Sequence, residues 1–228
     1  MQLNNKFLAI FILVFTNLFS ADFGSLQDEL KEALISWKTS EIEKLLDTGA
    51  DLNGEWSDGQ TIFNQYIFYS PEATVLEHLP FLLDHGADLH MRDSKFGYNP
   101  LATAITKGYY KLAQKLLESS GDPRGDVNNI DNAGKTMLMI TMPLAMLDLL
   151  LKYGAADTIN HHDSKGLTSL MYIAEQCNLP KVRTLVNAGA NYKLTDNDGY
   201  NVLHYAENAD DDARCSSLIS YLKGLKSA

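Results

Sequence analysis

The sequence lacks most of the features that mark the common functional classes. Its 228 residues include only two cysteines and six prolines, and no run of Lys or Arg. The formal net charge at pH 7 is −10, which excludes the basic surface that nucleic-acid-binding proteins use to displace phosphate counterions. Hydrophobic residues make up 45% of the chain, so we expect a folded core rather than disorder.

Motifs that carry catalysis are also missing. The sequence contains no glycine-rich phosphate loop, no G-x-S-x-G, no H-E-x-x-H and no C-x-x-C. We therefore expect no enzymatic activity, no cofactor and no metal site. The alternative is a haem- or metal-handling role, which is suggested by the adjacent His161 and His162 and by a cluster of methionines. Those methionines are Met137, Met139, Met142, Met146 and Met171. Asp210–Asp212 could collect Ca²⁺, but we expect a solvated acidic loop.

No apolar run reaches the ~20 residues that a transmembrane helix needs. A shorter apolar run, residues 7–19, follows the single basic residue Lys6 and precedes the small residues Ser20 and Ala21. This pattern predicts a secretory signal peptide over residues 1–20, cleaved near Ser20/Ala21. The alternative is an uncleaved anchor. Either way, we expect the rest of the chain to be periplasmic or secreted, with no stable membrane insertion after cleavage.

The two cysteines, Cys177 and Cys215, lie far apart in the sequence. In an oxidising compartment they could pair as a disulfide. The alternative is two separate thiols, because two cysteines alone are weak evidence for a bond. The sequence leaves both options open.

The chain repeats two short phrases in alternation. "LLDTGADLN" at 45–53 returns as "LLDHGADLH" at 82–90, with weaker copies beginning at Leu116, Leu149 and Leu185. A second phrase also recurs. Its first copy is "SDGQT", which starts at Ser57, and its last copy is "DNDGYN", which starts at Asp196. Two phrases that alternate at about 33 residues predict an array of helical repeats.

The residues of each phrase predict a local structure. The glycine after the leucine pair should end a helix in the left-handed conformation. These glycines are Gly49, Gly86, Gly121, Gly154 and Gly189. The aspartate of "D-x-x-G" should accept hydrogen bonds from downstream amides in a tight turn, as expected for Asp131, Asp163 and Asp196. The Thr or Asn after that turn should cap the next helix. These residues are Thr61, Asn99, Thr136, Thr168 and Asn201.

The two phrases resemble the ankyrin repeat, whose pattern is D-x-x-G-x-T-P-L-H-x-A followed by L-L-x-x-G-A-D-x-N. The resemblance covers about Leu30 to Leu222 and implies an all-α fold: an ankyrin-repeat solenoid of about six helix–turn–helix units with β-turn or hairpin fingers, preceded by the signal peptide. The implied domain spans 22–228. Its units are expected at approximately 26–53, 54–90, 91–128, 129–160, 161–193 and 194–228, with the end units as caps. His204 occupies the family's His position, which implies a structural hydrogen bond between neighbouring units.

Departures from the pattern predict irregular parts. Extra residues in the second unit should lie in the loop around Ser70–Glu72, and "SSGDPRGDVNN" should lengthen the turn of the third unit. The fourth unit should have a shortened first helix or inner loop near Pro143.

The resemblance implies a non-catalytic, monomeric module that binds another protein on a concave face of fingers and first helices. By their positions in the motif, the predicted partner-binding residues are Trp56, Asp58, Phe68, Tyr69, Lys95, Phe96, Lys107, Asn132, Lys165, Tyr172 and Asn197. Ser57, Gln65, Thr103, Ala133, Ser164 and Asp198 hold equivalent positions. Aromatic side chains should dominate the binding energy. Alternatives within this reading are an immunity or inhibitor protein for a toxin or enzyme, and an accessory factor for an oxidative-stress enzyme such as a catalase.

Overall fold

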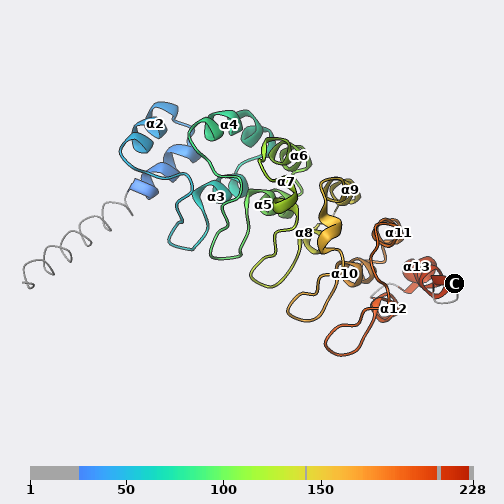
Figure 1. The fold of residues 1–228 in the computed structure, drawn as a ribbon. Helices are drawn as coiled ribbons and strands as arrows, with labels where there is room; N and C mark the ends of the chain where they lie inside the picture. Colours follow the sequence, from blue (N-terminus) through green and yellow to red (C-terminus); the bar gives the residue numbers. More distant parts are fainter. Residues whose placement is uncertain (1–25, 142, 210–211, 226–228) are drawn as a thin grey trace, which may run out of the picture. The chain divides into compact units, whose positions relative to one another are not determined.

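The computed structural model describes residues 26–141, 143–209 and 212–225 (Figure 1). The predicted signal peptide and its cleavage site, Met142, and Asp210 and Asp211 lie outside this part of the chain. The chain forms two compact units, residues 1–88 and 89–228, and each is described separately below. No helix within the described ranges has both the length and the apolar character to span a bilayer.

Residues 26–88 of the N-terminal unit contain four helical segments. They are residues 26–35, α2 (Thr39–Asp47), α3 (Ile62–Tyr69) and α4 (Glu72–Asp84). Gly49 and Gly86 follow α2 and α4 with φ of 105° and 85°, so these two predicted left-handed helix ends are confirmed. The segment between α2 and α3 forms a finger closed by an isolated antiparallel bridge between Glu55 and Thr61.

The extra residues of the second repeat do not form the loop that we predicted around Ser70–Glu72. Only Ser70 and Pro71 separate α3 from α4, and α4 is 13 residues long. The insertion therefore lengthens the helix. Apolar residues at helical spacing, including Val75, Leu79 and Leu82, are fully buried along α4, which favours helix over loop for the added turn.

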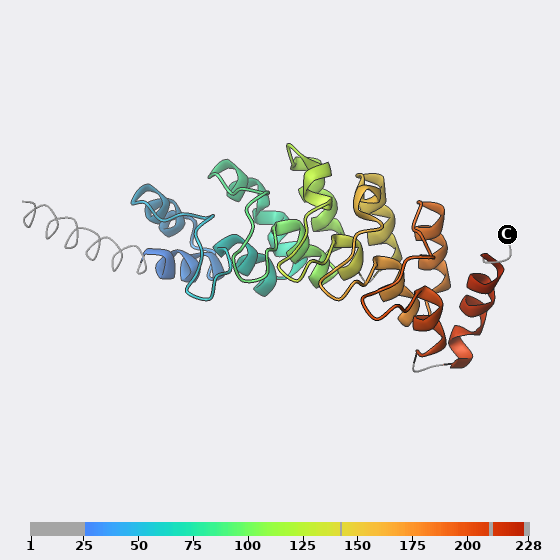
Figure 2. The same cartoon turned by 60° about the horizontal axis from the view of Figure 1, so that its bottom comes forward.

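In the C-terminal unit, the described residues form four helix pairs and two short additions. The elements are α5 (Pro100–Lys107), α6 (Tyr110–Ser119), α7 (Pro123–Val127), α8 (Met137–Ile140), α9 (Leu144–Lys152), η1 (Ala155–Thr158), α10 (Ser169–Glu175), α11 (Leu179–Asn187), α12 (Val202–Glu207) and α13 (Asp212–Leu225). The first helices α5, α8, α10 and α12 pack in one row, and α6, α9, α11 and α13 pack in a second (Figures 1 and 2). The predicted short first helix of the fourth repeat is confirmed, since α8 has four residues.

Side-chain caps start most first helices as predicted. The side chains of Thr61, Asn99, Thr168 and Asn201 accept hydrogen bonds from backbone N–H groups of the first turns of α3, α5, α10 and α12. Thr136 is different, because its Oγ1 is buried and finds no hydrogen-bond partner among the described residues. The very short α8 therefore begins without a side-chain cap.

Finger turns are held by their aspartates, which confirms that prediction. Oδ1 of Asp131 accepts hydrogen bonds from the amides of Ala133 and Lys135 at 2.9 and 2.7 Å. Asp163 and Asp196 repeat this arrangement with the amides two and four residues downstream. Each carboxylate thus replaces water for two turn amides, and the finger conformation is fixed locally.

Three expectations from the motif are wrong. Gly121 does not take the left-handed conformation, and "GDPRGDV" does not lengthen a turn. Instead the Asp122 side chain accepts from the Gly125 amide at 2.9 Å and caps α7. His204 makes no hydrogen bond to a neighbouring repeat among those described. It stacks on Tyr200 with ring centroids 3.8 Å apart, and its Nδ1 lies 3.3 Å from Asn208 Nδ2 in the same repeat.

Successive repeats are joined by asparagines at their ends. In the N-terminal unit, Asn53 donates to the Gly86 carbonyl at 2.9 Å and accepts from the Asp88 amide at 2.7 Å. In the C-terminal unit, Asn160 makes the same pair of bonds to Gly189 and Asn191. The last residue of one repeat therefore completes the helix-ending turn of the next.

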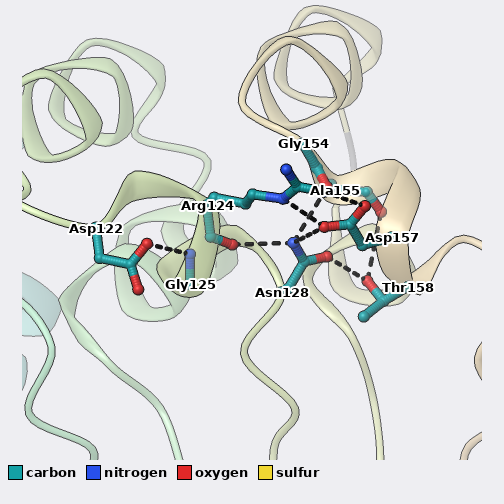
Figure 3. A network of polar contacts seen from close by, with 8 residues as sticks. All are labelled: Asp122, Arg124, Gly125, Asn128, Gly154, Ala155, Asp157 and Thr158. Atoms are coloured by element: carbon teal, nitrogen blue, oxygen red, sulfur yellow. Dashed lines mark hydrogen bonds and ion pairs between the residues drawn. The ribbon is translucent and has the colours of Figure 1, made fainter.

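Asn128 belongs to a larger network of this type, between α7 and η1 (Figure 3). It donates to the Gly154 carbonyl at 3.1 Å and accepts from the Thr158 hydroxyl at 2.9 Å. Beside it, Arg124 makes two hydrogen bonds to the Asp157 carboxylate, at 2.6 and 2.8 Å. This pairing raises the pKa of Arg124 and, through the guanidinium hydrogen bonds, lowers the pKa of Asp157.

Cys177 and Cys215, for which the sequence left two options, form a disulfide with Cα atoms 4.8 Å apart. Cys177 lies between α10 and α11 and has a φ of 55°. Gly108 holds the equivalent position between α5 and α6 and has a φ of 72°. Cys215 is fully buried on α13. The bond therefore ties the inner loop of the fifth repeat to the last helix.

Candidate binding surface

A small pocket opens on the N-terminal unit between the helical segment 26–35 and α3. Leu34 and Ile62 form its apolar floor, and both are almost fully buried. Ile35 and Tyr69 stand at its rim and are 54% and 67% exposed. The other lining residues are Lys31, Gln65 and Tyr66. An apolar depression with a large exposed apolar rim is a feature of ligand- and protein-binding sites.

Four of the predicted partner-binding residues lie at or beside this pocket. Tyr69 lines it, and Phe68, 40% exposed, packs edge-on against Tyr69 with ring centroids 5.3 Å apart. The finger residues Trp56 and Asp58 are linked to the pocket lining. The Lys31 ammonium lies 3.4 Å from the centroid of the Trp56 ring. This position suits a cation–π contact, so the finger and the pocket form one surface.

Gln65 is one of the polar residues that line the pocket. The equivalent-position prediction placed Gln65 and Thr103 on the exposed face, but they are only 5% and 3% exposed, because α3 and α5 turn these positions inward. The Gln65 amide donates to Asp58 Oδ1 at 3.1 Å. Its Oε1 is buried without a hydrogen-bond partner among the described residues. A buried carbonyl that lacks a donor is unfavourable, and this oxygen is not exposed inside the pocket.

The lining residue Tyr66 belongs to a buried aromatic cluster. The Tyr66 hydroxyl and His78 Nδ1 are hydrogen-bonded, and Trp37 stacks face to face on His78 with centroids 3.3 Å apart. Burial raises the pKa of Tyr66 to about 12, and burial lowers the pKa of His78. Both groups are therefore neutral at pH 7.

In the C-terminal unit, the finger tips are hydrogen-bonded to one another. The Asn132 amide donates to the Phe96 carbonyl at 2.8 Å, and its side chain donates to the Ser94 carbonyl at 2.9 Å. Asn197 repeats both bonds one finger further along, to Lys165 and Ser164, each at 3.2 Å. The predicted residues Asn132 and Asn197 therefore hold neighbouring fingers together while remaining exposed.

The other predicted partner-binding residues of this unit differ in how exposed their side chains are. Phe96 is 42% exposed, and the Lys95 ammonium lies 5.1 Å from the Phe96 ring centroid. Lys165 is exposed at a finger tip. Lys107 is half-buried at the end of α5, and its ammonium lies 5.7 Å from the Tyr109 ring centroid. Phe96 is the exposed aromatic residue among the predicted finger residues of this unit.

Tyr172 serves to join a finger to a first helix. Its hydroxyl donates to Asp163 Oδ2 at 2.6 Å, and the Lys135 ammonium lies 4.7 Å from its ring centroid. Burial, followed by the hydrogen bond to Asp163, raises the pKa of Tyr172. Tyr205 makes the same contact with Asp196. These carboxylates therefore hold the fingers in place, rather than being available for chemistry.

Sequence reasoning missed the part of the pocket that comes from residues 26–35. Leu30, Ala33 and Leu34 are buried at helical spacing, and Lys31 and Ile35 lie beside that stripe. An isoleucine outside the buried stripe of an amphipathic helix was the signal that could have located the rim.

The described residues contain no group of three or more His, Cys, Asp or Glu arranged to hold a metal ion. The cluster of methionines is part of the core, because Met137, Met146 and Met171 are at most 1% exposed and Met139 is 7% exposed.

Comparison with known proteins supports the fold assignment. No family model matches the chain. Two solved structures are similar over most of their length. One is EF0377, an ankyrin repeat protein, at a TM-score of 0.67 and 22% identity, covering 87% of this chain and 97% of that one. The other is a chain from the complex of Bd0816, a predatory endopeptidase of Bdellovibrio bacteriovorus, with the immunity protein Bd3460, at a TM-score of 0.66 and 22% identity, covering 84% and 97%.

A curated relative is the palmitoyltransferase AKR1 of Lachancea kluyveri, 24% identical over 168 residues. The match takes in 72% of this chain but only 22% of the relative. This chain therefore spans about a fifth of the length of that enzyme.

Proposed function

We propose that this chain, which has the fold of ankyrin-repeat proteins, is a non-catalytic module that binds another protein through its fingers and first helices. The observation that carries the proposal is the surface around the N-terminal pocket. Ile35, Phe68 and Tyr69 are exposed there beside the finger residue Trp56. Large apolar and aromatic side chains held in water on one face by a rigid scaffold are typical of protein interfaces.

We propose further that the protein acts after export, in the periplasm or outside the cell. The apolar segment at residues 7–19 has the composition of a signal peptide. The disulfide between Cys177 and Cys215 supports the same location, because such bonds persist in oxidising compartments and are rare in the cytosol. Fractionation of cells that express the tagged full-length chain tests this proposal, and recovery of uncleaved protein from the cytosol would contradict it.

Binding is tested by capture from a periplasmic extract, with each captured protein quantified by mass spectrometry. We expect a partner that is retained by the wild type and lost from the double variants Trp56→Ala/Phe96→Ala and Phe68→Ala/Tyr69→Ala. Tyr110→Ala is the matched control, because Tyr110 is a 37% exposed aromatic on the second-helix row. Equal capture by all variants would show that this face is not the binding surface.

A second candidate, an immunity or inhibitor protein, is favoured by one comparison. The chain is similar over 84% of its length to a chain from the complex of an endopeptidase with its immunity protein. The test is co-expression with exported hydrolases encoded beside this gene, measured as growth. Rescue of growth by the wild type and not by Phe68→Ala/Tyr69→Ala supports inhibition, whereas lysis that is unaffected by the wild type contradicts it.

A further inference from the structure

The charge of the protein is divided unequally between the two compact units. Residues 26–88 contain three Lys and no Arg against 13 Asp and Glu, a net charge of −10. Residues 89–228 contain 15 Lys and Arg and 15 Asp and Glu, a net charge of zero. The whole excess of negative charge, −10, therefore belongs to the unit that holds the pocket.

Acidic side chains flank the pocket itself. Asp28 and Glu32 lie three residues before the lining residues Lys31 and Ile35, so each stands one helical turn from the rim on the same face. On the other side, Asp58 accepts the Gln65 hydrogen bond. Asp28, Glu32 and Asp58 are all exposed, which gives a basic partner carboxylates to meet on both sides of an apolar depression.

The interior of the pocket specifies the rest of the occupant. Its floor and rim, formed by Leu34, Ile35, Ile62 and Tyr69, match an apolar side chain. No polar atom of its lining is exposed inside the pocket, so the pocket selects an apolar group rather than a hydrogen-bonding one. An anionic membrane surface fits less well, because the surrounding charge would repel it.

We propose that this pocket binds a peptide segment of a partner protein in which an apolar side chain is flanked on both sides by Lys or Arg. The inference rests on the proposed protein-binding function and adds the chemistry of the partner. The apolar side chain packs against the shallow pocket and its exposed rim residues Ile35 and Tyr69, and the basic residues meet Asp28, Glu32 and Asp58.

The test is a titration of the ¹⁵N-labelled protein with three synthetic peptides, followed by amide chemical shifts. The first is Lys-Lys-Gly-Phe-Gly-Lys-Lys, the second replaces Phe by Ala, and the third replaces every Lys by Glu. We expect the first to shift the amides of Lys31, Ile35, Gln65 and Tyr69. The Ala peptide should bind about tenfold more weakly, since the anchoring side chain dominates such contacts, and the Glu peptide should not bind. Added salt should weaken the first peptide.

Protein variants complete the design. Ile35→Asp and Tyr69→Ala change exposed side chains, so both should keep the wild-type Tm, and each should weaken the Phe peptide about tenfold. Tyr200→Ala, which removes a 46% exposed aromatic of the neutral C-terminal unit, should bind as the wild type does.

Three results would overturn the inference: no shifts at millimolar Phe peptide, equal binding of the Phe and Ala peptides, or binding of anionic vesicles at the same amides. Failure of this inference is distinguishable from failure of the proposed function. If a natural partner is lost with Phe96→Ala but retained with Ile35→Asp, the pocket is excluded as the binding site, and the proposed protein-binding function still stands.

Discussion

Reduction of the Cys177–Cys215 disulfide should lower the free energy of unfolding by about 4 kcal/mol. The bond closes a loop with a sequence separation of 38 residues. The loop-closure relation gives about 13 cal/mol/K of entropy removed from the unfolded chain for a loop of this length, or about 4 kcal/mol at 25 °C. Cys215 is fully buried, so its reduced thiol stays in an apolar position and adds little further cost.

The assay is urea unfolding of the oxidised protein, the reduced protein and the variant Cys177→Ala/Cys215→Ala. The reduced protein and the double variant should unfold at similar urea concentrations, both well below the oxidised protein. Hydrogen exchange should locate the effect. In a linear array, stability is a sum of neighbouring contacts, so amides of α12 and α13 should lose protection before those of α5. A change below about 1 kcal/mol, or a uniform loss of protection, would refute the loop-entropy reasoning.

Other substitutions test other parts of the structure. Asn160→Ala removes two hydrogen bonds to backbone groups of the next repeat and should cost about 1–2 kcal/mol in urea unfolding; the exposed Asn187→Ala on α11 is its control, and equal stability of the two variants would contradict the bridging role. Gly189→Ala should lower the free energy of unfolding by about 1 kcal/mol from backbone strain alone, because the space around Gly189 is open. Gly166→Ala should lower it more, because an added Cβ would lie 2.5 Å from the Asn197 amide nitrogen. The reverse order would show that crowding between fingers is unimportant. His78 has a folded pKa below its ordinary value of 6.5 because it is buried, so the unfolded chain binds more protons and stability should fall as the pH drops below about 6.5. Unfolding curves of the wild type and His78→Gln between pH 8 and pH 5 measure this, and a parallel decline in both would exclude His78 as the cause.

The parts of the fold that could be predicted from sequence are those set by local chemistry. A glycine after a leucine pair and an aspartate before a turn each meet a need of their own backbone, and this is why Gly49, Gly86 and Asp131 behave as expected. Gly121 fails because Asp122 and Pro123 offer a competing local solution, the start of α7. The repeat motif specifies the spacing of the glycine but not the neighbouring residues that can cap a helix.

The candidate site was less predictable, because it depends on which side chains share a surface. Trp56, Phe68 and Tyr69 could be named from their places in the repeat. Their partners Lys31 and Ile35 come from a segment that has no turn phrase before it, so the motif gave no position for them. The position rule also treated Thr103 as exposed, whereas packing within α5 buries it. Tertiary contact, rather than local pattern, decides both.

The asparagine bridges make the array directional. Asn53 and Asn160 each complete a turn that belongs to the repeat after them, so the repeat that follows each bridge is finished by its predecessor. Cutting the chain before such a repeat strips its helix-ending turn of a donor and an acceptor, whereas cutting after the turn leaves the bridge intact. The two ends of such a protein therefore differ in how well they tolerate truncation. Shortening or extension of the chain is tolerated more easily on the C-terminal side of each bridge.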